Sequence, residues 1–337
     1  MSVVNRRITL AARPVGLPKV SDFQLVYAPL PSPEAGEVVV RTVYLSLDPW
    51  VANPVHRAER HAPPVAIGEV LTGGAVGQVV ESRDPGFRVG DIVAGILGWQ
   101  EYALAGGDAL RRIDPALAPI SAALGVLGLP GLTAYFGMLD ICCPQPGETV
   151  VVSGAAGAIG MVAGQIARIR GCRVVGVANS GAALDWLLDE LGFDAALGFA
   201  SAAKLDGELE RLCPDGVDAY FDNVGGSLTE AVLRNLNSGA RIAVCGQLPR
   251  FDVGESEIGP RSPGQRIATP TNVQGCLVSA HTGRFDEALE HLLRWLQQGD
   301  LRYREQIAQG IEAAPQAFIG MLRGRNQGTQ LVQLSPA

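Results

Sequence analysis

The sequence predicts an α/β protein of two domains: a mostly β domain built from both chain ends, and a doubly wound parallel sheet inserted between them. Short β-branched runs punctuated by Gly and Pro fill the first 120 residues or so, which is typical of a compact β domain. From Thr149 onward, apolar strands alternate with helical stretches, as in a parallel sheet. The strand-like Gln330–Leu334 indicates a return to the first domain. We therefore expect domains at 1–122 with 300–337, and at 123–299.

The individual elements follow from the same patterns. In the first domain, strands are expected at Glu37–Val43, Val76–Val80 and Asp91–Ala94. A helical stretch, Ile120–Leu139, interrupted by Leu129-Pro130-Gly131, leads into the second domain. There, a six-stranded sheet is expected to include Thr149–Ser153, Arg173–Ala178, Ala219–Phe221, Ala240–Cys245 and Val273–Val278. The expected helices are Ala158–Arg170, Ala182–Leu191, Ser227–Leu236 and the amphipathic Phe285–Gln298.

Composition excludes several classes of protein. With 47% hydrophobic and 18% charged residues, the 337-residue chain is globular rather than disordered. A net charge of −7 without a basic run disfavours a nucleic-acid partner. The N-terminus lacks the apolar core of a secretory signal, and no stretch of 18 apolar residues predicts a membrane span. We therefore expect a cytoplasmic protein without a membrane partner.

A glycine-rich turn carries the clearest chemistry. Thr149–Ser153 runs directly into Gly154-Ala155-Ala156-Gly157-Ala158-Ile159-Gly160, a helix follows, and Arg173–Ala178 completes a βαβ unit. Gly157 would let backbone approach a pyrophosphate, and Gly160 would let the helix pack closely on the strand. Exposed N–H groups and the helix dipole would attract phosphates. The pattern predicts dinucleotide binding.

The end of the second strand bears on the choice between NAD and NADP. NAD-binding folds often place an acid there for the ribose 2′-hydroxyl, but this chain reads Asn179-Ser180-Gly181 and has no acid before Asp185. A 2′-phosphate would meet no repulsion, so NADP is allowed and NAD stays open. Asn179 and Ser180 could donate hydrogen bonds to either cofactor; the alternative is that they cap the next helix.

Several further motifs match one family. The chain resembles, over essentially its whole length, the prostaglandin reductase / leukotriene B4 12-hydroxydehydrogenase branch of the zinc-independent medium-chain dehydrogenases/reductases. Bacterial curcumin reductase and plant alkenal double-bond reductases belong to this branch. The matching runs are Ser21–Phe23, Leu47–Trp50, Gly128–Gly137, Leu191–Asp194, Tyr220–Gly226, Arg241–Gly246 and Gly324–Gly328.

The resemblance implies a GroES-like β domain, a Rossmann domain, a homodimer, and NADPH-dependent reduction of α,β-unsaturated ketones or aldehydes. It implies pyrophosphate contacts at Gly157, Ala158 and Ile159. It also implies that Asn223, Cys245 and Gly246 lie near the ribose and nicotinamide, and Asn326 near the phosphates.

This chain departs from the family pattern at four positions. Ala183 and Phe199 stand where relatives commonly have a Lys and a Tyr that contact the 2′-phosphate, which predicts weaker discrimination for NADPH over NADH. Phe251 stands where many relatives have an active-site Tyr, and Ala52 where some have an Arg. Both changes favour a neutral, hydrophobic substrate.

Zinc catalysis is not expected. Zinc needs three protein ligands of N, S or O type, yet the usual ligand positions read Ser46-Leu47-Asp48 and Gly68-Glu69. His56 and His61 lack an evident third ligand. The cysteines fit no metal pair and no disulfide framework, so we expect buried small hydrophobes: Cys142, Cys143, Cys172, Cys213, Cys245 and Cys276.

Without zinc, the chain is expected to reduce the carbon–carbon double bond of an enone or enal. Hydride would add to the β-carbon, and hydrogen-bond donors would stabilise the developing enolate. Candidate pocket residues are Trp50, Tyr135 and Phe251, with core packing as the alternative for each. Two other functions stay open: a quinone oxidoreductase with the same fold, and a protein that binds the dinucleotide without turnover.

Overall fold

The computed structural model describes residues 4–52, 65–198, 202–246 and 270–336. The chain forms two compact units. The terminal unit comprises Met1–Leu124 and Glu305–Ala337, and the central unit comprises Gly125–Arg304.

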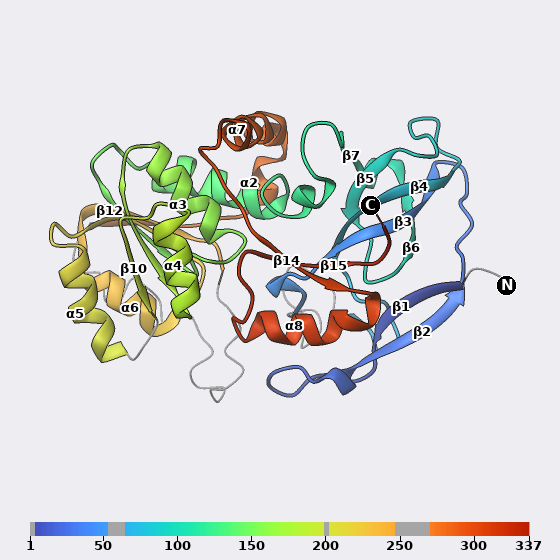
Figure 1. Ribbon diagram of the computed structural model, residues 1–337, viewed down its shortest axis with the longest axis horizontal. Coiled ribbons are helices and arrows are strands. Elements are labelled where there is room, and N and C mark those ends of the chain that lie inside the picture. The colour runs from blue at the N-terminus through green and yellow to red at the C-terminus, as the bar shows by residue number, and fades with distance from the viewer. Residues whose placement is uncertain (1–3, 53–64, 199–201, 247–269, 337) are drawn as a thin grey trace. The chain divides into compact units, whose positions relative to one another are not determined.

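The terminal unit is mostly β (Figure 1). Its strands are β1 Val4–Leu10, β2 Phe23–Pro29, β3 Glu37–Ser46, β4 Gly74–Ser82, β5 Ile92–Ile96, β6 Tyr102–Gly106, β7 Arg111–Arg112, β14 Glu305–Gln309 and β15 Thr329–Gln333. A seven-stranded sheet runs in the order β14-β15-β3-β4-β5-β7, with β6 also paired to β3, and β1 and β2 form a separate antiparallel pair. Because β15 pairs antiparallel with β3, both chain ends build one sheet.

The helix α8, Ala314–Leu322, packs on this unit through aromatic contacts. Its Phe318 meets Trp99 edge-on at 5.4 Å between ring centroids, and Phe23 from the start of β2 stacks on Trp99 at 6.1 Å. Trp99 and Phe318 are fully buried. Such a cluster buries a large apolar area, so it fixes α8 against the N-terminal strands. Short 3-10 turns complete the unit: η1 Val20–Asp22, η2 Pro49–Val51, η3 Gly107–Ala109, η4 Ile120–Leu124 and η9 Ile311–Ala313.

The central unit holds a six-stranded parallel sheet. Its strands are β8 Thr149–Ser153, β9 Arg173–Ala178, β10 Ala195–Gly198, β11 Val217–Asp222, β12 Leu236–Val244 and β13 Thr271–Gly275. They run in the order β10-β9-β8-β11-β12-β13, which is the doubly wound order of dinucleotide-binding folds. The direction of winding reverses between β8 and β11, so a crevice for a ligand is expected at their carboxyl ends.

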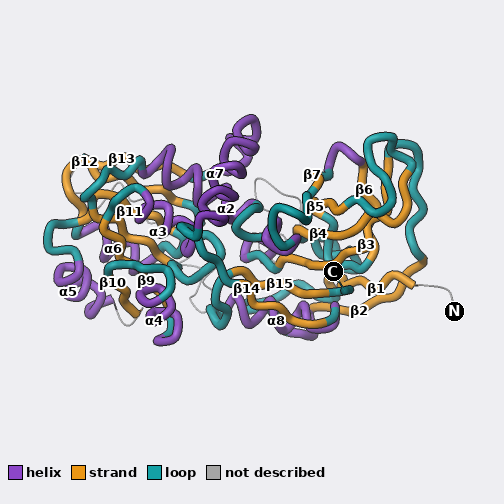
Figure 2. The backbone as a smooth tube through the Cα atoms, turned by 45° about the horizontal axis from the view of Figure 1, so that its top comes forward, coloured by secondary structure: helices purple, strands orange, loops and turns teal. Residues whose placement is uncertain are grey.

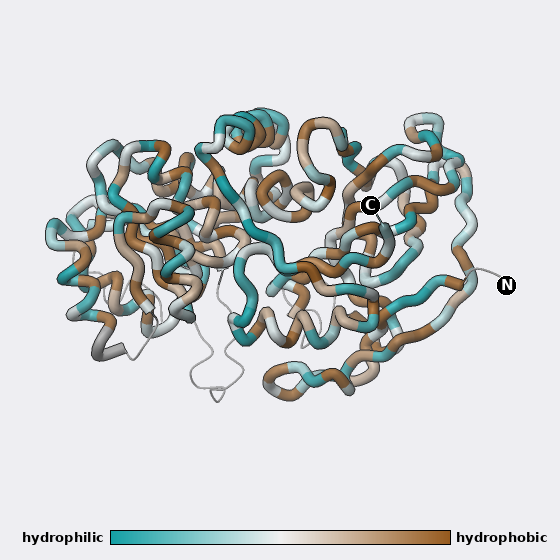
Figure 3. Tube along the Cα trace, viewed as in Figure 1, coloured by the Kyte–Doolittle hydropathy of each residue, from teal (hydrophilic) through white to brown (hydrophobic). Residues whose placement is uncertain are grey.

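Helices cover both faces of this sheet. They are α2 Leu129–Phe136, α3 Gly160–Ile169, α4 Gly181–Asp189, α5 Ala202–Leu212, α6 Gly226–Arg234 and α7 Phe285–Gln298, with shorter turns η5 Gly137–Cys142 and η8 Val278–Arg284. The helix α2 contacts α3 and α7, whereas α5 contacts α6, and Figure 2 shows α5 and α6 on the other side of the strands from α2 and α7. In Figure 3, α7 alternates between hydrophobic and hydrophilic segments, and it buries Ala288 and Leu292.

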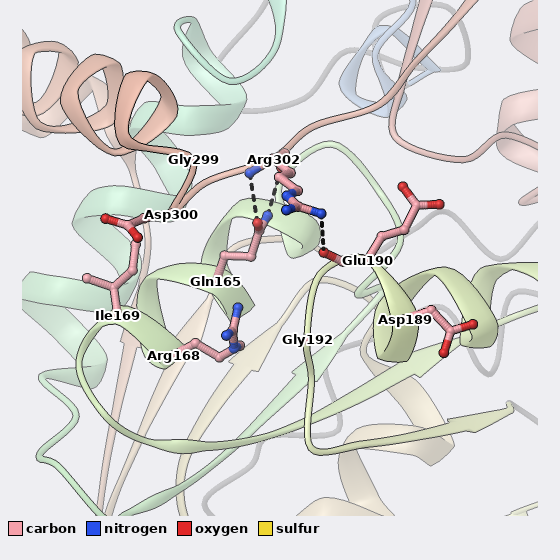
Figure 4. A pocket seen from close by; sticks show the side chains of 9 residues that line it. All are labelled: Gln165, Arg168, Ile169, Asp189, Glu190, Gly192, Gly299, Asp300 and Arg302. Atoms are coloured by element: carbon pink, nitrogen blue, oxygen red, sulfur yellow. Dashed lines mark hydrogen bonds between the residues drawn. The ribbon is translucent and has the colours of Figure 1, made fainter.

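The units meet at Leu124/Gly125 and Arg304/Glu305, rather than at the predicted 122/123 and 299/300. Leu124 belongs to the terminal unit because it packs in a core cluster with Val76 and Leu331. At the other crossing, the Gln165 side chain exchanges two 2.8 Å hydrogen bonds with the backbone of Arg302 (Figure 4). These contacts hold the chain on the central unit beyond residue 300.

The predicted fold class is confirmed, with corrections to individual elements. The helical stretch expected at Ile120–Leu139 is interrupted as predicted, but the break precedes Leu129, where the helix α2 begins; a 3-10 turn lies before the break, and the wider π-type turn η5 follows α2. The strand β10 and the helix α5 were not predicted. By contrast, the strands β8 and β9 and the helix α7 have the predicted bounds.

Candidate cofactor site

The glycine-rich turn follows β8, whose residues are all buried. Gly154 has a φ of +59°, a left-handed conformation that favours glycine. At Gly160, a Cβ atom would lie 2.3 Å from the carbonyl oxygen of Gly154, so only glycine lets the first residue of α3 approach the turn this closely. The predicted packing role of Gly160 is therefore visible in the local geometry.

The start of α3 presents unpaired donors. Among the backbone hydrogen bonds of the described residues, the N–H groups of Ala158, Ile159 and Gly160 have no acceptor, and no side chain caps the helix. The carbonyl oxygens of Gly157 and Ile159 already accept from the first turn. Three free N–H groups at the positive end of a ten-residue helix form a site that suits a phosphate.

A hydrogen-bonded network fills the point where the winding reverses. Asp222, at the end of β11, is 3% exposed. Its carboxylate accepts from the Ser153 hydroxyl at the end of β8 at 3.2 Å, from Gly225 N at 2.8 Å and from the Thr229 hydroxyl at 2.6 Å. It also accepts from Val224 N and from the hydroxyl of the buried Tyr220. These bonds tie the ends of β8, β11 and α6 together.

The network orients Asn223 toward the crevice. Its backbone N–H donates to the Ser153 hydroxyl and its side-chain amide to the Ser153 carbonyl, both at 2.8 Å. The remaining side-chain oxygen of Asn223 is buried and has no partner among the described residues. An orphaned buried acceptor calls for a donor from outside the protein, and a ribose hydroxyl or a carboxamide N–H would satisfy it.

Cys245 and Gly246 lie beside this network. Their N–H groups both point at the carbonyl oxygen of Asp222, at 2.9 and 3.3 Å. The main chain of Gly246 is exposed, and Cys245 is partly buried. The structure thus places Asn223, Cys245 and Gly246 at the carboxyl ends of two neighbouring strands.

The end of β9 is more open. Asn179 and Ser180 are both exposed. The hydroxyl oxygen of Ser180 caps α4 by accepting a hydrogen bond from Ala183 N at 3.2 Å, which is the helix-capping alternative considered for this residue. Its hydroxyl hydrogen is not used by that bond. Ala183, the position of the family Lys, is only 4% exposed, whereas Ala182 beside it is exposed.

The pocket candidates fall in different places. Trp50 lies on η2 of the terminal unit with 41% of its surface exposed. Tyr135 on α2 is 3% exposed, and its hydroxyl lies 2.7 Å from Nδ1 of His291 on α7, so it is packed in the central unit. Burial raises the pKa of Tyr135, and Glu287 adds to this effect. Phe251 and Phe199 lie outside the described residues.

Asn326 belongs to the terminal unit, where its side-chain amide donates to the carbonyl oxygen of Gly328 at 2.9 Å. This bond closes the turn before β15.

The usual zinc positions, Ser46–Asp48 and Gly68-Glu69, hold no cysteine and no histidine. Ser46 is 2% exposed and carries a hydroxyl, and the Glu69 carboxylate accepts from Ala66 N at 2.9 Å in a surface turn. Across the described parts of the chain, no group of three or more His, Cys, Asp or Glu side chains could hold a metal ion.

A second hollow, of about 430 Å³, lies at the opposite end of α3 (Figure 4). Its polar lining includes Arg168, Glu190 and Asp300. Arg168 donates to the Leu191 carbonyl at 2.9 Å and Glu190 pairs with Arg304 at 2.8 Å, so the charges of these two side chains have protein partners. The hollow is distinct from the cofactor crevice, and its charges serve to hold α3, α4 and the chain after α7 together.

Known proteins resemble the chain over nearly its whole length. Two family models match, the N-terminal domain of oxidoreductase at residues 6–113 and zinc-binding dehydrogenase at 158–294. A putative NADP-dependent oxidoreductase of Bacillus subtilis is 46% identical, with 99% of each chain covered. The NADPH-dependent curcumin reductase of Escherichia coli is 41% identical, covering 98% of this chain and 97% of the relative.

A solved structure, CurA of Vibrio vulnificus in complex with NADPH, superposes with a TM-score of 0.92 at 39% identity, covering 98% and 100% of the two chains. The chain therefore belongs to the medium-chain dehydrogenases/reductases, in the zinc-independent branch of the prostaglandin, curcumin and alkenal reductases. The resemblance drawn from the sequence motifs is confirmed.

Sequence reasoning missed the residues that organise the site. Ser153, Asp222 and Thr229 were not among the predicted site residues, although they hold Asn223 in place. A signal was present: Asp222 ends an otherwise apolar strand, and a charged residue at the carboxyl end of a parallel strand commonly lies at the ligand edge.

Proposed function

We propose that the chain is an NADPH-dependent reductase of the carbon–carbon double bond in α,β-unsaturated ketones or aldehydes. The observation that carries this is the cradle of three free N–H groups at the start of α3, beside the orphaned oxygen of Asn223. Both features fit a dinucleotide, and the relatives named for NADP-dependent reduction cover nearly the whole chain.

NADPH, when bound, supplies the hydride that adds to the β-carbon of the substrate. The residues of this chain bind and orient it: Ala158, Ile159 and Gly160 donate their N–H groups to the pyrophosphate. Asn223 accepts a hydrogen bond through its orphaned oxygen, and the Asp222 network keeps that oxygen in position. Gly157, Asn179, Ser180, Cys245, Gly246 and Asn326 are the further cofactor contacts that we propose.

Protonation of the α-carbon falls to solvent in this proposal. The hydroxyl of Tyr135 lies against His291 and Glu287 on α7 and is not available as an acid. Burial also raises its pKa, which makes it a weaker acid. The aromatic residues Trp50 and Phe251 have no acidic group, which suits a small hydrophobic substrate.

The test is steady-state oxidation of NADPH by the purified protein with an aryl enone, an enal and a quinone. Product mass should show two hydrogens gained, and spectroscopy should place them at the former double bond. Formation of an allylic alcohol would refute double-bond reduction. Turnover with the quinone alone would favour a quinone oxidoreductase, and no turnover with any acceptor would favour a dinucleotide-binding protein.

Catalysis is proposed to proceed without zinc, since Ser46 and the Gly68-Glu69 pair do not supply its ligands. We expect metal analysis of active protein to find no stoichiometric zinc and a chelator to leave the rate unchanged. About one zinc per active chain, lost with activity on chelation, would contradict this.

A homodimer and a cytoplasmic location complete the proposal. Among the described residues β13 is the last strand of the sheet, and four of its five residues are exposed, which supports a contact between two copies at this side of the sheet. Six free cysteines are typical of a reducing compartment. No helix in the described residues is long and apolar enough to cross a membrane. Sedimentation of the native protein tests the dimer.

A further inference from the structure

Two cysteines face each other across neighbouring strands at the cofactor edge. The register of β12 and β13 places Val244 opposite Gly275. Cys276 N donates to the Val244 carbonyl at 2.8 Å, so the ladder continues and puts Cys276 opposite Cys245. Residues opposite each other on adjacent strands point to the same face, about 4.8 Å apart. A disulfide commonly joins Cα atoms about 4.4–6.8 Å apart.

The pKa values of the two thiols shift in opposite directions. A hydrogen bond from Cys245 lowers the pKa of Cys276, because it stabilises the Cys276 thiolate. Burial, together with the neighbouring Cys276, raises the pKa of Cys245. Burial also raises the pKa of Cys142 to about 12 and of Cys172 and Cys213 to about 11. A cysteine with a lowered pKa beside a second thiol is the arrangement of an attacking and a resolving cysteine.

We propose that Cys276 and Cys245 form a reversible disulfide when the protein meets a hydroperoxide. The Cys276 thiolate attacks the peroxide O–O bond, giving a sulfenic acid and, after protonation, an alcohol or water. The Cys245 thiol then attacks the sulfenic sulfur, a sulfur–sulfur bond forms, and water leaves with the thiol proton. Two thiols lose two electrons in total, and the peroxide gains them. Excess small thiol reverses the step by thiol–disulfide exchange.

The disulfide would act on the cofactor site through the chain at Cys245. The N–H groups of Cys245 and Gly246 are bonded to the carbonyl oxygen of Asp222, the residue that organises Asn223. Drawing Cys245 toward Cys276 pulls on that contact. This consequence rests on the proposed cofactor role of the crevice, whereas formation of the disulfide does not.

The experiment uses the native protein without cofactor, titrated with hydrogen peroxide. The protein is then alkylated, digested without reduction, and mapped by mass spectrometry. The first product is expected to join the Cys245 and Cys276 peptides, to disappear on treatment with dithiothreitol, and to form more slowly when NADP is bound. Titration of the oxidised protein with NADPH should show affinity reduced about tenfold or more.

Two variants separate this pair from general thiol oxidation. Cys276→Ser should form no such cross-link and should keep its NADPH affinity after peroxide. Cys143→Ser, which removes the exposed thiol, should still form the cross-link. Mapping of the wild type decides the matter even if Cys276→Ser folds poorly. The proposal is overturned if Cys143 is oxidised while Cys245 and Cys276 stay reduced, or if the cross-link forms only in unfolded protein. A cross-link without loss of NADPH affinity would refute the coupling to the cofactor site alone.

Discussion

Replacing Gly160 by Ala tests the phosphate cradle most directly. The new Cβ would lie 2.3 Å from the Gly154 carbonyl oxygen and 2.8 Å from the Cα of Ala155, where ordinary contact begins at 3.4 Å. The turn and the helix must therefore separate by about an ångström, and overpacking of this kind typically costs about 1–3 kcal/mol. The three N–H groups move with the helix, so NADPH affinity should fall about tenfold to a hundredfold.

The assay is a fluorescence titration with NADPH, alongside chemical unfolding of the same preparation. Gly181→Ala is the matched control: it also lies at the first residue of a helix in the central unit, and a Cβ there would meet nothing within 4 Å. That variant should keep its affinity and change stability by less than about 1 kcal/mol. If both variants bind NADPH equally well, the cradle at α3 is not the phosphate site.

Three further substitutions probe the remaining parts of the site. Asp222→Asn weakens bonds from five donors, so the free energy of unfolding of this variant should fall by about 2–4 kcal/mol and its affinity for NADPH should fall as well. The control Asp218→Asn, at the other end of β11, should lose less stability, and equal losses in the two variants would contradict the role of Asp222. Ala182→Lys adds a cation at an exposed position after β9 and should lower KM for NADPH relative to KM for NADH about tenfold. An unchanged ratio of the two KM values would argue against a 2′-phosphate at this position. Tyr135→Phe should lose about 0.5–1.5 kcal/mol of stability and keep kcat, and a kcat loss of about a hundredfold would restore Tyr135 as a catalytic residue.

Periodicity predicted the elements that bury a regular face. The strand β8 has a run of three buried valines, Val150–Val152, between Thr149 and Ser153, and α7 places apolar residues on one side, so both have the predicted bounds. The strand β10 has only four residues and ends in glycine, which gives too short a pattern. The helix α5 is polar overall, and its apolar face is narrow: Leu205 and Leu209 are buried one turn apart, and Leu212 packs beside them.

The turn chemistry of the site could be predicted, but its supporting network could not. Gly160 was recognised because close approach of backbone demands glycine at a fixed spacing after a strand. The partners of Asp222 come from positions as far apart in sequence as Ser153 and Thr229. Such contacts depend on the order of the strands in the sheet, and the sequence pattern of a single segment does not reveal that order. The boundary at Arg304 is similar, since it depends on the bonds between Gln165 and Arg302.

The charge around the crevice explains how it can take a 2′-phosphate without an evident cation on the second strand. The nearest carboxylate along the strand ends, Asp222, is buried and receives five donors, so its charge is already compensated by the protein. After β9 the exposed residues are Asn179 and Ser180, which are neutral, and the first acid is Asp185, farther along α4. Among the described residues near the end of β9, repulsion of a 2′-phosphate is therefore small, and hydrogen-bond donors and helix dipoles would favour its binding. That balance predicts only a modest difference in affinity between NADP and NAD, because neutral donors stabilise the ribose hydroxyl of NAD nearly as well.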